Sequence, residues 1–84
     1  MIIQTTESFD RQYSRLTAKN QSRFKERIEV FQANPFDQAL RNHALRGKYL
    51  GYRSIDITGD LRALYTVKGD TIIISVCRQP FAAI

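Results

Sequence analysis

The spacing of apolar residues changes once along the chain, and this change limits the folds that the sequence permits. Phe9, Tyr13 and Leu16 recur at intervals of three and four residues, as one face of a helix requires. A second helical pattern runs over residues 20–34, where a following proline stops it. From Gly51 onwards the period is two, which predicts strands. The chain is therefore expected to continue from helices into a sheet.

Three predicted strands follow one another with short turns between them. Residues 51–57 and 61–67 alternate between apolar and polar positions. Residues 71–76 form a nearly continuous apolar run, which suits a central strand buried on both faces. Gly59 lies in the first turn, where it can take a positive φ at no steric cost, and Gly69 marks the second turn. These three strands are expected to form an antiparallel meander.

The order of the elements predicts the architecture. Residues 1–6 are rich in β-branched side chains and indicate a further strand, followed by a helix that Thr6 or Ser8 is expected to cap. The order is then β-α-α-β-β-β. It predicts an α+β fold, with an antiparallel twisted sheet and an α-helical hairpin packed on one face. Residues 36–48 show no clear period and are expected to form a loop or a short helical turn.

Length and composition define the class of protein. The 84 residues are expected to form one domain, residues 1–84, and 43% hydrophobic with 25% charged residues is typical of globular chains. No apolar run approaches the roughly 18 residues that a membrane helix needs. The N-terminus lacks the basic and apolar regions of a signal peptide. A soluble, cytoplasmic domain without membrane contact is expected.

Positive charge is concentrated in the second half of the chain. The formal net charge is +5. Residues 1–40 carry six Lys and Arg against five Asp and Glu, whereas residues 41–84 carry seven against three. This asymmetry favours a polyanionic partner, either nucleic acid or an acidic protein, that contacts the second half.

Few side chains are available for metal or thiol chemistry. The chain has one histidine, His43, and one cysteine, Cys77, and its carboxylates are scattered, so neither a metal nor another cofactor is expected. A Cys77 nucleophile paired with His43 lacks a local motif, and a structural thiol at a strand end fits better. The glycines lie at predicted turns and form no phosphate-binding loop.

Arginines on the predicted strands are the main candidates for a functional site. Arg53 and Arg62 lie on neighbouring strands and Arg78 follows the third, so their side chains are expected to converge on one end or face of the sheet. Clustered guanidinium groups stabilise the charge that a phosphodiester develops in its transition state. His43 is a candidate general base or acid, because the ordinary pKa of histidine lies near neutrality. Spacing alone favours a simpler alternative, in which the arginines cap a solvent-facing sheet and His43 stacks in a loop.

Five stretches follow one another over nearly the whole chain: the helical segments "SFDRQYSRL" and "FKERIEVFQANP", then "HALRGKYLGYRSIDI", "GDLRALY" and "IIISV". In their order and spacing the chain resembles the RelE/YafQ/ParE superfamily, the toxins of bacterial type II toxin–antitoxin modules. The stretch "HALRGKYLGYRSIDI" is similar to the H-x-L-x-G…G-Y-R stretch of YafQ-like members. "GDLRALY" resembles the D-x-R-x-x-Y strand of the superfamily, and "IIISV" its last core strand. The resemblance implies the RelE-like fold.

The resemblance also implies a function and partners. Ribosome-dependent members are endoribonucleases, or mRNA interferases, which cleave messenger RNA in the ribosomal A site by attack of a ribose 2′-hydroxyl on the adjacent phosphate and so inhibit translation. The implied partners are the ribosome and a cognate antitoxin with an acidic toxin-binding segment, in a heterotetramer or a larger complex. Two alternatives stay open: a ParE-like inhibitor of DNA gyrase, and a catalytically degenerate toxin that only binds its antitoxin.

Site residues follow from the resemblance position by position. The implied catalytic residues are His43, Asp60, Arg62 and Arg78. The residues expected to bind RNA phosphate are Arg46, Lys48 and Arg53, and Phe81 is expected to stack on a base. The chain departs from YafQ-like members at two places, since Asp56 stands where they have a second histidine and Pro80 stands near a further expected histidine.

Overall fold

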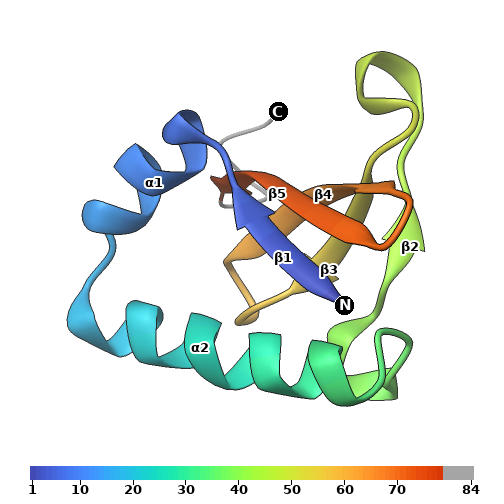
Figure 1. Ribbon diagram of the computed structural model, residues 1–84. Coiled ribbons are helices and arrows are strands. Elements are labelled where there is room, and N and C mark those ends of the chain that lie inside the picture. The colour runs from blue at the N-terminus through green and yellow to red at the C-terminus, as the bar shows by residue number, and fades with distance from the viewer. Residues whose placement is uncertain (79–84) are drawn as a thin grey trace.

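A computed structural model describes residues 1–78 of the chain, and the side chains of residues 1–75 (Figure 1). Phe81 and its predicted stacking role lie outside the described residues. The helices and strands are β1 (Ile2–Thr5), α1 (Glu7–Ser14), α2 (Ala18–Ala33), β2 (His43–Ala44), β3 (Arg53–Asp56), β4 (Arg62–Lys68) and β5 (Thr71–Arg78). Two short 3-10 turns, η1 (Gln38–Leu40) and η2 (Gly47–Tyr49), flank β2 in the sequence.

The strands form one five-stranded sheet in the order β1-β5-β4-β3-β2. The apolar strand β5 is an interior strand between β1 and β4, as its sequence predicts. Full burial on both faces is not observed, because Ile72 and Ile74 are buried whereas Ile73 is only partly buried. The predicted α+β fold is confirmed, with a mixed sheet in which β1 runs parallel to β5 and the other neighbours are antiparallel. A parallel pair needs a long connection, and here the whole chain between β1 and β5 provides it.

The hydrophobic core lies between the sheet and the two helices, and contains Phe9 of α1 and Phe24 and Phe31 of α2 (Figure 1). Phe31 of α2 meets Tyr65 of β4 edge to face, with 5.1 Å between the ring centroids. Ile55 of β3 and Ala63 of β4 are opposite each other in the sheet, and both are buried in the same core. Because side chains alternate along a strand, the residues next to Ile55 and Ala63 point to the other face, which we call the open face. Ser54 and Leu64 on this face are nevertheless buried, whereas Asp56 and Arg62 are partly exposed.

Threonine side chains start both helices of the predicted helical hairpin. The hydroxyl oxygen of Thr6 accepts a hydrogen bond from the backbone N–H of Phe9 and donates to the carbonyl oxygen of Ser75, which joins the start of α1 to β5. Thr17 accepts from the N–H of Asn20 in the same way. Each cap satisfies a backbone donor that the helix itself leaves unpaired. Neither helix in the described part of the chain is long and apolar enough to cross a membrane.

The segment between α2 and β3 contains more structure than the predicted loop or helical turn. β2 pairs with β3 at one edge of the sheet, so His43 lies on a strand and not in a loop. The turn η2 lies in a hairpin that projects beyond this edge (Figure 1). The sequence could not reveal β2, because two residues are too few to show a period.

The two glycine turns of the meander differ from each other. Gly69 adopts φ 62°, as its turn requires, whereas Gly59 is not among the residues with positive φ, so the expectation for Gly59 is wrong. The hydroxyl oxygen of Thr58 accepts hydrogen bonds from the N–H groups of Asp60 and Leu61. The threonine side chain therefore stabilises this turn without a left-handed glycine.

The packing of Phe31 predicts a large loss of stability when its ring is removed. Phe31 is 1% exposed, so Phe31→Ala should lower the free energy of unfolding by about 3–5 kcal/mol through lost burial and a cavity. Phe36 is the matched control, because it is 65% exposed and should lose at most about 1 kcal/mol on the same substitution. Urea unfolding followed by circular dichroism measures both, and equal losses would contradict the described core.

Candidate functional site

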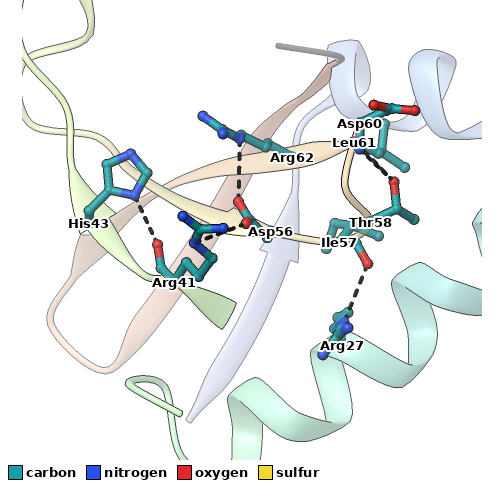
Figure 2. Close-up of polar contacts among 9 residues, drawn as sticks. All are labelled: Arg27, Arg41, His43, Asp56, Ile57, Thr58, Asp60, Leu61 and Arg62. Carbon is teal, nitrogen blue, oxygen red and sulfur yellow. Dashed lines mark hydrogen bonds and ion pairs between the residues drawn. The ribbon is translucent and has the colours of Figure 1, made fainter. Parts of the chain in front are cut away.

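Four polar residues come together on the open face of the sheet (Figure 2). They are Arg41, which follows η1, His43 of β2, Asp56 of β3 and Arg62 of β4. Asp56 and Arg62 are opposite each other in the sheet, one position beyond the core pair Ile55 and Ala63. We call these four residues the open-face cluster.

Asp56 connects the two arginines of the open-face cluster. Its Oδ1 lies 3.3 Å from Nε of Arg62, and its Oδ2 lies 3.8 Å from Nε of Arg41. Asp56 and Arg62 form an ion pair and not a hydrogen bond. Asp56 Oδ1 and Arg62 Nε are both buried, and neither has an aligned hydrogen bond to any described residue. One carboxylate between two guanidinium groups leaves a local excess of positive charge. An anion such as a phosphate is the ligand that this excess favours.

Of the two ring nitrogens of His43, Nδ1 has a hydrogen-bond partner and Nε2 has none among the residues that the structure describes. Its Nδ1 lies 2.9 Å from the carbonyl oxygen of Arg41 (Figure 2). A carbonyl oxygen can only accept a hydrogen bond, so this contact requires the proton to be on Nδ1. In the neutral ring, Nε2 then carries the lone pair, and Figure 2 shows it on the side of the ring away from Arg41. The exposed His43 can therefore accept a proton at Nε2.

Arg53 does not join the open-face cluster, although Arg62 does. Arg53 is opposite Tyr65 in the sheet, so it shares the core face with that ring. Its Nε donates a hydrogen bond of 2.8 Å to Oδ1 of Asn42, and its guanidinium carbon lies 5.3 Å from the ring centroid of Phe36. Asn42 in turn donates to the hydroxyl of Tyr65. Arg53 thus holds the segment after α2 against the sheet, and the expected convergence with Arg62 does not occur.

Asp60 also lies apart from the open-face cluster. It is exposed in the turn between β3 and β4, where its backbone N–H donates to Thr58. Figure 2 shows its carboxylate directed away from Arg62 and His43. The structure therefore does not bring Asp60 together with His43 and Arg62, which were predicted as catalytic residues alongside it.

The remaining predicted residues lie at two other places. Arg46 and Lys48 are exposed on the projecting hairpin around η2, where Nζ of Lys48 lies 5.4 Å from the ring centroid of Tyr49. The backbone of Arg78 is paired with that of Arg62, which places Arg78 beside the open-face cluster along the sheet. Its side chain lies outside the described residues.

Two members of the open-face cluster, Arg41 and Asp56, were not predicted as site residues. Asp56 had a usable signal, because it alternates with the core residues of its strand and so shares a face with Arg62. Arg41 had none. Its backbone adopts the left-handed conformation, with φ 50° and ψ 45°. This conformation is uncommon for arginine and cannot be predicted from the residue type.

The open-face cluster combines a proton acceptor with cationic groups. Within residues 1–78, no three or more His, Cys, Asp and Glu side chains gather as they would around a metal ion. The chemistry that these described side chains offer is proton transfer by His43 and charge stabilisation by Arg41 and Arg62. Such a set suits a reaction at a phosphate ester.

Solved structures with the same fold are toxins. The chain is similar to the YoeB/ParE toxin from Agrobacterium tumefaciens, with 26% identity and a TM-score of 0.78 over 94% of this chain and 98% of that one. YafQ from E. coli strain BL21(DE3) has 17% identity and a TM-score of 0.78, over 98% and 96% of the chains. A heterotetrameric YoeB-YefM toxin-antitoxin complex from Staphylococcus aureus contains a chain with 21% identity and a TM-score of 0.75, over 93% and 94%. The last two are likenesses of fold alone. Together they define the class as a RelE-like toxin fold.

The sequence comparison gives the family. The family model described as bacterial toxin of type II toxin-antitoxin system, YafQ, matches residues 1–79. This chain belongs to the YafQ family of type II toxins. A search of curated proteins finds no match.

The position of Arg53 predicts that it supports the fold. Arg53→Ala should lower the free energy of unfolding by about 1–3 kcal/mol, because it removes a charged hydrogen bond and leaves Oδ1 of Asn42 without its donor. Lys68→Ala removes the same charge from an exposed site on β4 and should change stability by about 0.5 kcal/mol or less. Urea unfolding of both variants measures the difference. A loss for Arg53→Ala no larger than that for Lys68→Ala would show that Arg53 has no structural role.

Proposed function

We propose that this YafQ-family toxin is a ribosome-dependent endoribonuclease that cleaves messenger RNA in the ribosomal A site. The observation that carries the proposal is the open-face cluster. In it His43, whose Nε2 has no partner among the described residues, lies with two arginines that both face Asp56. The concentration of positive charge in residues 41–84 supports an RNA partner, because the phosphate backbone attracts basic surfaces.

The proposed reaction begins at His43. Its Nε2 takes the proton from a ribose 2′-hydroxyl, and the 2′-oxygen attacks the adjacent phosphorus. The bond between phosphorus and the 5′-oxygen breaks, and that oxygen takes up a proton from water. The products are a 2′,3′-cyclic phosphate and a 5′-hydroxyl end. No metal or other cofactor takes part in these steps.

The arginines would act on the phosphate. In both ion pairs the guanidinium atom that faces Asp56 is Nε, so the terminal amino groups are available for the phosphate oxygens. Charge on these oxygens increases as the 2′-oxygen attacks, and a cation already in place stabilises the transition state more than the ground state. Arg62 is the better placed of the two, since its side chain is 40% exposed against 78% for Arg41. A less exposed cation acts with less screening by water.

Cleavage of messenger RNA on purified ribosomes tests the proposal. His43→Ala and Arg62→Ala should each lower the rate of A-site cleavage by about 100-fold or more, because each removes a group that acts in the transition state. Primer extension locates the cut, and arrest of cell growth on expression gives a second measurement. Lys68→Ala is the matched control, since it removes a positive charge elsewhere on β4 and should retain the activity of the unaltered chain.

Three results would overturn this proposal. Ribosome-dependent cleavage that survives both substitutions would show that the reaction takes place elsewhere on the protein. Inhibition of DNA gyrase supercoiling without any RNA cleavage would establish the ParE-like alternative. A protein that neither cleaves A-site RNA nor slows growth would be a degenerate toxin that only binds its antitoxin.

We also propose that a cognate antitoxin binds this chain. The support is the family itself and the similar fold of the toxin in the S. aureus toxin-antitoxin complex. The product of the neighbouring reading frame should co-purify with the chain and relieve growth arrest, and light scattering should give the mass of a heterotetramer or a larger complex. His43→Ala should bind it as well as the unaltered chain does, because His43 is proposed to act on RNA. Failure of the two proteins to associate would refute this partner.

A further inference from the structure

We propose that Arg41 is a positioning residue. Its backbone conformation decides which ring nitrogen of neutral His43 carries the proton. The inference rests on the proposed function for its catalytic consequence, but its structural claim stands independently of RNA cleavage. The claim is that the left-handed backbone of Arg41 directs its carbonyl oxygen at Nδ1 of His43, which keeps Nε2 free as the base.

The backbone of Arg41 is exceptional in this chain. Among residues 1–78, Arg41 is the one residue other than glycine with a positive φ. Its N–H donates to the carbonyl oxygen of Gln38 and closes η1, so the left-handed turn ends η1 and reverses the chain. The carbonyl oxygen of the same residue then accepts from His43, two residues later. Uncommon backbone conformations persist where the surroundings hold them, and such residues gather at functional sites.

The side chain of Arg41 makes a separate contact within the open-face cluster. Its Nε lies 3.8 Å from Oδ2 of Asp56, on the strand that pairs with β2. The guanidinium is 78% exposed, so this ion pair contributes little to stability by itself. It does connect the residue to Asp56, which also faces Arg62. One residue thus joins the proposed base to the proposed phosphate-binding cation, through its carbonyl oxygen and its side chain respectively.

Substitutions at position 41 separate the backbone role from the charge. Arg41→Gly and Arg41→Asn remove the guanidinium but accept the left-handed region readily. Arg41→Val also removes the guanidinium, but a β-branched residue is strongly disfavoured there. The three variants lose the same charge and differ in whether the carbonyl oxygen can stay in place.

Nuclear magnetic resonance of the full, untagged chain measures the tautomer directly. Long-range ¹H–¹⁵N correlations distinguish Nδ1–H from Nε2–H in a neutral imidazole, and His43 is the one histidine of the sequence, so the signals need no assignment. The spectra are recorded at alkaline pH, where imidazoles are neutral. The unaltered chain, Arg41→Gly and Arg41→Asn should show Nδ1–H, whereas Arg41→Val should lose it. Backbone amide spectra of the same samples report whether each variant is folded.

The cleavage assay adds the catalytic consequence. The rate for Arg41→Val should fall about tenfold or more below that of Arg41→Gly, since a positioned general base contributes about 100- to 10,000-fold. Equal rates for Arg41→Gly and Arg41→Val in folded proteins would overturn the positioning role.

The tautomer of the unaltered chain decides the structural claim even if Arg41→Val does not fold. Nε2–H as the main form would overturn it, and so would the loss of Nδ1–H in Arg41→Gly. A chain with Nδ1–H that cleaves no RNA would refute the endoribonuclease proposal and leave the effect of Arg41 on His43 standing. Cleavage of RNA by a chain whose His43 carries Nε2–H would refute the effect of Arg41 on His43 and leave the endoribonuclease proposal standing.

Discussion

The register of β3 against β4 is the constraint on which both the core and the open-face cluster depend. Ile55 is opposite Ala63 beneath α2, and the next pair, Asp56 and Arg62, therefore faces the other way. A shift of one residue in either strand would turn a carboxylate or a guanidinium towards Phe31 in the core, where an unpaired charge is very costly. Burial of the two apolar residues thus decides where the ion pair lies.

The register of β3 against β4 also places two arginines, each on a predicted strand, on opposite faces of the sheet. Arg53 and Arg62 both lie on strands of one antiparallel pair, yet they lie on opposite faces of the sheet. Arg53 faces the segment after α2, where the oxygen of Asn42 and the ring of Phe36 engage its guanidinium. Arg62 faces solvent beside Asp56. Location on a face, and not residue type, distinguishes an arginine that supports the fold from one that is available to a phosphate.

Much of the fold was predictable, because it depends on period and on turns. The helical spacing of Phe9 and Tyr13, the alternation in β3 and β4, and the apolar run of β5 are all local properties of the chain. The strand β2 and the parallel pairing of β1 were not predictable in the same way. The first has two residues, and the second depends on a partner about 70 residues further along the chain.

The sequence by itself determined both helices, four of the five strands and their order, the YafQ-family resemblance and the candidacy of His43 and Arg62. Only the tertiary structure decided which charged residues meet. It left Asp60 and Arg53 outside the open-face cluster and brought in Arg41 and Asp56. The physical reason is that periodicity is repeated at every turn of a helix or strand, whereas the meeting of side chains depends on pairing register and on single backbone angles. The left-handed φ of Arg41 is such an angle, and no spacing of residues encodes it.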